Sequence, residues 1–235
     1  MVKTLIKAEY AYLRQLFTKR IIVSPIDLPP KSNSKKLILL LTVYLLLDLV
    51  LTIMIGLPLD ALFPEIGEAY GAMEDFSEFQ FVLMAVLLAP PLEEFLFRLP
   101  LRYSRRNLRI WLVFTALFAL AFQYIVSLIL FGFWLYWLSL GKNRHFEVKI
   151  MRFYKRYGVV IFWFFTLFFA AIHLSNFTAK DLPLHLYLPA VVPQIIAGIS
   201  LGVTRLRLGF WWAMLLHALF NLIVTLPTLL LMENA

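Results

Sequence analysis

Long runs of apolar residues constrain this chain more than any other feature of its sequence. Several runs approach the ~20 residues that an α-helix needs to cross a bilayer. Of the 235 residues, 62% are hydrophobic and only 15% are charged, whereas a soluble domain carries about a quarter charged residues. The surplus apolar surface must face lipid, where only helices and closed barrels satisfy their backbone groups. We therefore expect an all-α, polytopic transmembrane helix bundle.

The apolar runs predict where the chain crosses the membrane. Single spans are expected at 37–59, 79–100, 158–177, 186–204 and 208–231. The stretch 110–140 is longer, and basic segments that should both be cytoplasmic flank it, so an even number of crossings must separate them. A tight helical hairpin is the favoured interpretation, and a single long tilted helix or a re-entrant pair is the alternative. The total is about seven spans (six to eight), with the N-terminus cytoplasmic and the C-terminus outside.

Residues 1–36 form a basic segment ahead of the membrane domain at 37–235. We expect this segment to be an amphipathic helix on the cytoplasmic membrane surface, and a plain basic tail is the alternative. The net charge of +8 is spread over short segments between apolar runs, so it sets orientation and does not predict nucleic-acid binding. The chain has no cysteine, which excludes disulfides, thiol catalysis and cysteine-ligated metals. These features favour an integral protein of the bacterial cytoplasmic membrane.

Two adjacent acids, Glu93 and Glu94, interrupt the second span. They follow Pro90-Pro91, a pair that should kink the helix or free its carbonyls. A charge at membrane depth costs at least ~2.5 kcal/mol, so each acid needs a partner or a purpose. Glu94 and Arg98 lie four residues apart and can form an ion pair. Glu93 is left without a local partner and is placed to accept a proton; the alternative is that both acids cap or pair with neighbouring helices.

Two later spans each carry a pair of residues at four-residue spacing. Phe169 and His173 share one helix face, with small alanines between them. His217 and Asn221 also share a face, and both can donate hydrogen bonds into a common cavity. Ordinary interhelical packing would produce either pair, so neither is diagnostic alone.

A Gly-x-x-x-Gly pattern joins Gly198 to Gly202 within an apolar span. Small residues at this spacing let two membrane helices approach closely. We expect this face to pack against the helix of Glu93 or the helix of His217.

The polar residues of three spans form a chemically coherent set. Glu93 can act as a general base and polarise a water together with His173. His217 and Asn221 can then donate hydrogen bonds to the oxyanion that forms when this water attacks a carbonyl. Hydrolysis of a peptide bond fits these parts and needs no serine or cysteine nucleophile.

In this order, Glu93-Glu94-x-x-x-Arg98, Phe169-x-x-x-His173 and His217-x-x-x-Asn221 resemble the three motifs of the CPBP family. The family comprises type II CAAX prenyl proteases and bacteriocin-processing or Abi-type membrane proteins. The resemblance covers about residues 79–231 and implies an intramembrane glutamic protease without a cofactor, acting on a membrane-associated protein or peptide. The interval between the first two motifs is longer than the family's. An inserted hydrophobic hairpin at 110–140 and a basic loop, Lys142–Arg156, fill the difference.

The resemblance also implies a role for each motif residue. Glu93 matches the catalytic glutamate, His173 its partner in water activation, and His217 and Asn221 the oxyanion-stabilising pair. Three further residues would support the site geometry: Glu94, Arg98 and Phe169. Zinc bound by Glu93, His173 and His217 is an alternative, although the metal-free mechanism is preferred. A non-catalytic partner-binding or bacteriocin-immunity protein of the same fold is the main alternative function. A small transporter is another, against which the lack of an internal repeat counts.

Overall fold

A computed structural model describes residues 11, 14, 34–71, 76–122, 124–139, 144–177 and 182–232. Within these residues every regular element is helical, and the only extended contact is an isolated β-bridge between Tyr70 and Phe177. The predicted all-α class is therefore confirmed. The surface helix predicted within residues 1–36 falls almost entirely outside the described residues.

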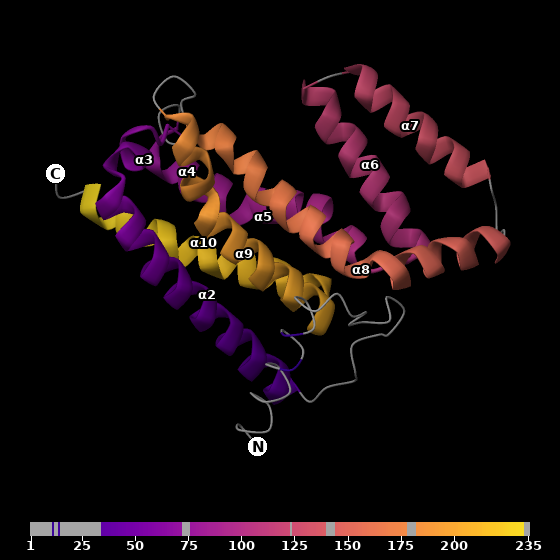
Figure 1. The fold of residues 1–235 in the computed structure, drawn as a ribbon, viewed down its shortest axis with the longest axis horizontal. Helices are drawn as coiled ribbons and strands as arrows, with labels where there is room; N and C mark the ends of the chain where they lie inside the picture. The colour runs from indigo at the N-terminus through magenta and orange to yellow at the C-terminus, as the bar shows by residue number, and fades with distance from the viewer. Residues whose placement is uncertain are drawn as a thin grey trace.

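The elements follow one another along the chain with short connections. Their bounds are α2 (Ser34–Leu62), α3 (Pro64–Glu68), α4 (Glu78–Leu83), the π-helix η1 (Met84–Leu88), α5 (Ala89–Glu93), the π-helix η2 (Glu94–Arg98), the 3-10 helix η3 (Leu99–Leu101), α6 (Arg105–Phe122), α7 (Tyr124–Ser139), α8 (Arg144–Ile172), the 3-10 helices η4 (His173–Asn176) and η5 (Leu184–Leu186), α9 (Tyr187–Arg207) and α10 (Phe210–Met232). Helix α9 packs against α2, α8 and α10 and so forms the centre of the bundle (Figure 1).

Within the described residues, four helical segments are long and apolar enough to cross a membrane. They are Leu37–Leu62, Phe79–Leu101, His145–Asn176 and Leu184–Arg207. The segment Phe210–Leu226 is apolar but shorter. These segments agree with an integral membrane protein, while the total of about seven spans and the cytoplasmic N-terminus stay predictions.

The stretch 110–140 forms parts of two helices, α6 and α7, which pack along each other. Figure 1 shows this pair standing at one side of the bundle, next to the first turns of α8. A single long helix is therefore excluded, because α6 ends at Phe122 and α7, which begins at Tyr124, packs along it. Whether both helices cross a bilayer stays a prediction.

The basic stretch Lys142–Arg156 was expected to be a loop, and from Arg144 onward that expectation is wrong. Helix α8 already begins at Arg144 and continues to Ile172. Tertiary contacts explain the early start: Glu147 lies 3.3 Å from Arg105 of α6, and buried Tyr154 donates a hydrogen bond to the carbonyl of Pro100. One face of this helical stretch thus packs on the protein, while Lys149, Arg152, Lys155 and Arg156 are exposed.

The Gly-x-x-x-Gly face packs against α8, not against the helices of Glu93 or His217 as predicted. A Cβ on Gly198 would lie 3.0 Å from Thr166, and one on Gly202 would lie 2.6 Å from the ring of Phe162. Because these two glycines have no side chains, α8 can pack closely against α9. Since α8 ends at the second motif, this contact also sets where His173 lies.

Candidate functional site

The predicted span 79–100 is a broken helix, in which two π-helices flank the short helix α5. The break follows from the proline pair. The amide of Ala89 bonds five residues back, to the carbonyl of Met84. The next residue, Pro90, has no N–H, so the carbonyl of Ala85 loses its next donor in the helix. Asn221 of α10 donates its side-chain N–H to that carbonyl at 2.7 Å.

Side chains of other helices also bond to the backbone after the acids. Irregular backbone is tolerated at membrane depth only where neighbours satisfy its polar groups. The bonds are Trp111 Nε1 of α6 to the carbonyl of Leu96 (2.8 Å), Arg205 Nε of α9 to that of Arg98 (3.0 Å), and Tyr154 Oη of α8 to that of Pro100 (2.9 Å). Four helices therefore hold the segment that carries the acid pair.

His217 lies between the two acids of the first motif. Its Nδ1 is 3.1 Å from Oε1 of Glu94, and its Nε2 is 3.5 Å from Oε2 of Glu93. The imidazole is 5% exposed and Glu94 is fully buried. Glu93, which lacked a partner along its own helix, therefore obtains one from the third motif. Only a doubly protonated imidazole can donate to both carboxylates at once.

Glu94 also faces Arg98, as the four-residue spacing predicted. Arg98 Nε lies 3.8 Å from Oε1 of Glu94, and both side chains are buried. The guanidinium carbon of Arg98 sits 4.3 Å from the ring centroid of Phe169, a cation–π contact. The phenylalanine of the second motif thus supports the ion pair of the first.

His173 begins the 3-10 helix η4 at the end of α8. Its Nδ1 lies 2.8 Å from the carbonyl of Phe169. A carbonyl only accepts, so Nδ1 carries the hydrogen, and in a neutral ring Nε2 keeps a free lone pair. This leaves Nε2 able to accept a hydrogen bond.

A half-open cavity of about 530 Å³ unites these residues. Glu93, His173, His217 and Asn221 all line it. The broken helix that carries Glu93 and the end of α8 that leads into His173 therefore meet at one cavity. Aromatic side chains form much of the remaining wall: Tyr70, Phe76, Phe81, Phe118, Phe169 and Phe220. The cavity therefore combines a small polar cluster with an apolar enclosure, as ligand sites do.

Asp48 of α2 also lines this cavity, and the sequence reasoning missed it. Its side chain is 1% exposed. A usable signal was present, because Asp48 lies in the middle of the apolar run 37–59. The cost of a charge at membrane depth, which singled out Glu93, applies equally to this residue.

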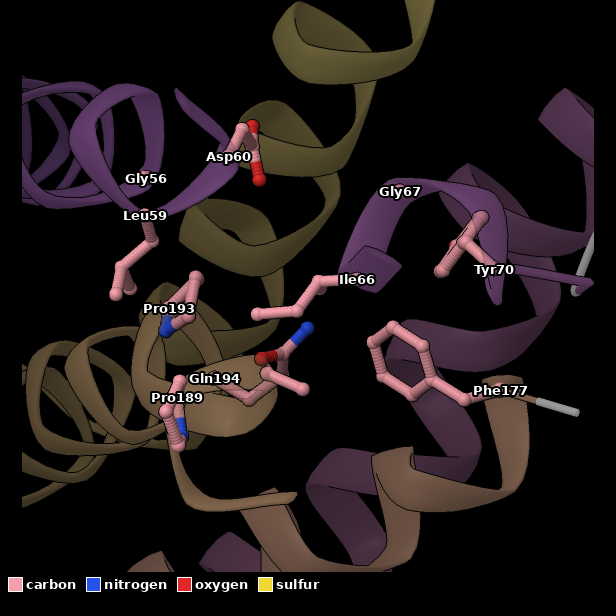
Figure 2. A pocket seen from close by; sticks show the side chains of 11 residues that line it. Gly56, Leu59, Asp60, Ile66, Gly67, Tyr70, Phe177, Pro189, Pro193 and Gln194 are labelled. Atoms are coloured by element: carbon pink, nitrogen blue, oxygen red, sulfur yellow. The ribbon is translucent and has the colours of Figure 1, made fainter. Parts of the chain in front are cut away.

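A second pocket, of about 190 Å³, adjoins the cavity and shares Tyr70, Pro193 and Gln194 with it. Figure 2 shows the amide of Gln194 between Pro193 and the side chains of Ile66 and Phe177. None of the three motifs contributes a residue to this pocket. It therefore borders the candidate site without belonging to it.

The donor geometry does not favour zinc. Among the described residues, no three His, Cys, Asp or Glu side chains converge in a way that could hold a metal ion. His217 already directs its two nitrogens at Glu94 and Glu93, and His173 directs one at a backbone carbonyl. The alternative set of Glu93, His173 and His217 thus does not fit a shared ion.

Comparison with protein-family models matches residues 144–223 to the family described as "Type II CAAX prenyl endopeptidase Rce1-like". The matched segment holds the second and third motifs, and the first lies outside it. Searches of the curated proteins and of the solved structures found no match. The predicted resemblance is confirmed: over α8, α9 and the first half of α10, this chain is similar to the type II CAAX prenyl endopeptidases, a family of CAAX-type proteases.

Proposed function

We propose that this chain is an intramembrane endopeptidase that hydrolyses a peptide bond with an activated water. One observation carries the proposal: Glu93, His173, His217 and Asn221 come from three separate motifs and line a single cavity. Nucleophile activation and oxyanion stabilisation are the two functions that peptide hydrolysis requires. These four side chains can supply both.

Glu93 is the proposed general base. Its carboxylate faces the cavity and removes a proton from the attacking water, while Nε2 of His173 accepts that water's second hydrogen bond. The bond from His173 Nδ1 to Phe169 supports this role, because it fixes the tautomer whose Nε2 is the acceptor. Two acceptors orient the water and direct its lone pair at the substrate carbonyl.

His217 and Asn221 are the proposed oxyanion donors. Glu94 holds His217 from the Nδ1 side at 3.1 Å, which leaves the opposite nitrogen at the cavity, 3.5 Å from Oε2 of Glu93. Asn221 bonds Ala85 through its side-chain nitrogen, and an amide nitrogen carries a second hydrogen. Both donors are therefore preorganised before substrate binds, which is the condition for strong electrostatic stabilisation.

Glu94, Arg98 and Phe169 are proposed to position the donors and do not touch the substrate. Arg98 balances the charge of Glu94, and Phe169 packs against both Arg98 and His217. The network resists rotation of His217, because each member is buried against the next.

The apolar cavity walls suit a membrane-associated peptide or a lipidated one. The family description supplies the first probe, a farnesylated peptide ending in Cys-aliphatic-aliphatic-any residue. An unmodified peptide of the same sequence serves as the second probe. The expected products are the released C-terminal tripeptide and the shortened peptide.

The test measures cleavage by purified protein in lipid nanodiscs, with mass spectrometry of the products. Glu93→Gln should lower kcat at least ~100-fold, because general base catalysis contributes about 10²–10⁴-fold. Glu65→Gln, at an exposed acid of α3, is the matched control and should cleave at the wild-type rate. Cleavage that survives Glu93→Gln would refute the base assignment. A parallel reaction with a chelator separates the metal-free mechanism from a metal-dependent one.

A further inference from the structure

Among the described residues that line the cavity, Asp48 is the one acid that the proposed mechanism does not use. It lies on α2, far along the chain from the three motifs, and is 1% exposed. Ser200 of α9 lies beside it, yet neither carboxyl oxygen reaches a partner in hydrogen-bond geometry within the described residues. A buried polar group without a partner is costly, so its presence calls for an explanation.

Asp48 shares its basic neighbours with the acid pair. Arg98 and His217 are the basic groups that act on it electrostatically, and Glu93 and Glu94 lie beside them. Arg205 acts on Glu94 as a third cation but is not among the groups that act on Asp48, so Asp48 depends on the two cations that Glu93 and Glu94 already contact. His173 adds no positive charge in its neutral form.

The ion-pair distances show which of the three carboxyls lacks a cationic partner. Arg98 and His217 both face Glu94, and the second nitrogen of His217 faces Glu93. Asp48 has no ion pair among the described side chains. An isolated buried carboxylate is so poorly solvated that it binds a proton instead of staying charged.

We infer that Asp48 holds a proton in the resting site and supplies it to the leaving amine when the peptide bond breaks. The inference rests on the proposed function. The two carboxyls then have separate roles: Glu93 accepts a proton and Asp48 donates one.

The proton balance closes over the reaction. Glu93 takes a proton from water as the water oxygen bonds to the substrate carbonyl carbon, and the carbonyl oxygen becomes the oxyanion. Asp48 then protonates the amide nitrogen, directly or through one water, as the C–N bond breaks. The oxyanion returns its electron pair to carbon, which gives a carboxylic acid and a free amine. Glu93 ends protonated and Asp48 ionised, and one proton passing from Glu93 to Asp48 restores the start.

Infrared spectroscopy tests whether Asp48 carries a proton, and it needs no substrate. The wild-type chain in nanodiscs should show the carbonyl stretch of a protonated carboxylic acid, and Asp48→Asn should remove that band. Asp60→Asn is the matched control, because Asp60 lies on the same helix but is exposed. It should leave the band unchanged. A band that survives Asp48→Asn overturns the inference.

Two substrates with different leaving groups test whether Asp48 acts as the proton donor. Asp48→Asn should lower kcat for the amide peptide about 100-fold with little change in KM, within the range for general acid catalysis. An analogue with a p-nitrophenyl ester at the cleaved bond needs no proton on its leaving group, so its hydrolysis should fall less than about tenfold. Equal losses for both substrates would show a purely structural role and overturn the inference. If the wild-type chain cleaves neither substrate, the proposed function fails and the donor role with it. The infrared band alone then shows whether Asp48 is protonated.

Discussion

The bundle around the acid pair and the α6–α7 hairpin are both rich in apolar residues but are held together differently. In the bundle, polar side chains of α8, α9 and α10 bond across to the broken helix. In the hairpin, α6 contacts that helix through Trp111 and through Phe114, which stacks on Phe95 at 4.2 Å. Helix α7 carries large apolar side chains that are exposed: Leu128, Ile129, Phe131, Leu135 and Tyr136.

The difference shows that apolar composition does not reveal how firmly a membrane segment is held. Lipid solvates leucine as well as a helix neighbour does, so apolar residues alone drive little association between helices. Close packing and interhelical hydrogen bonds supply the association. The bundle has both, and in the described residues the hairpin is bound to it chiefly through one face of α6.

Breaking the buried ion pair should produce the largest effect on the bundle. Arg98→Ala leaves Glu94 charged, buried and without its arginine, which should lower the free energy of unfolding by about 3–5 kcal/mol. Denaturation by SDS in lipid bicelles measures this loss. Arg106→Ala, at an exposed position of α6, is the control and should change stability by less than about 0.5 kcal/mol. Equal effects of the two would mean that the pair does not hold the bundle.

The same leucine truncation in the two regions compares them directly. Leu201 of α9 is 1% exposed, whereas Leu135 of α7 is 49% exposed. Leu201→Ala opens a cavity in the bundle and should cost about 2–5 kcal/mol. Leu135→Ala removes a side chain from an open surface and should cost less than about 0.5 kcal/mol. A comparable loss at Leu135 would show that another surface covers the hairpin.

The hydrogen bond between the regions should have the smallest effect. Trp111→Phe keeps an aromatic ring but removes the donor to the carbonyl of Leu96. The expected loss is about 1 kcal/mol, the usual net value of one hydrogen bond. Trp211→Phe, at a side chain 71% exposed, is the control and should be neutral. Faster hydrogen exchange of the α6 amides in Trp111→Phe alone would show that this bond anchors the hairpin.

The sequence predicted the all-α class and most of the long apolar helices, because hydropathy over ~20 residues is a local property. It also singled out the polar residues of the site, since a charged or polar group in an apolar run is conspicuous. The pairing of Glu94 with Arg98 was predictable for the same reason: both residues lie on one helix, four positions apart.

Two predictions failed because they concerned partners far away in the chain. The glycines Gly198 and Gly202 indicated close packing but not its partner, which is α8. The stretch after Arg144 seemed a loop from its charge alone, whereas contacts with α6 and η3 make it helical. Hydropathy carries no information about such contacts.

By itself the sequence determined that this chain is built of membrane-length helices and which of their residues carry chemistry. Only the tertiary structure decided that His217 joins Glu93 to Glu94, that Asn221 binds a carbonyl freed by Pro90, and that Asp48 belongs to the same cavity. The reason is physical. Helix formation and the cost of polar groups in lipid act over a few residues, whereas a shared cavity depends on the packing of helices up to about 170 positions apart.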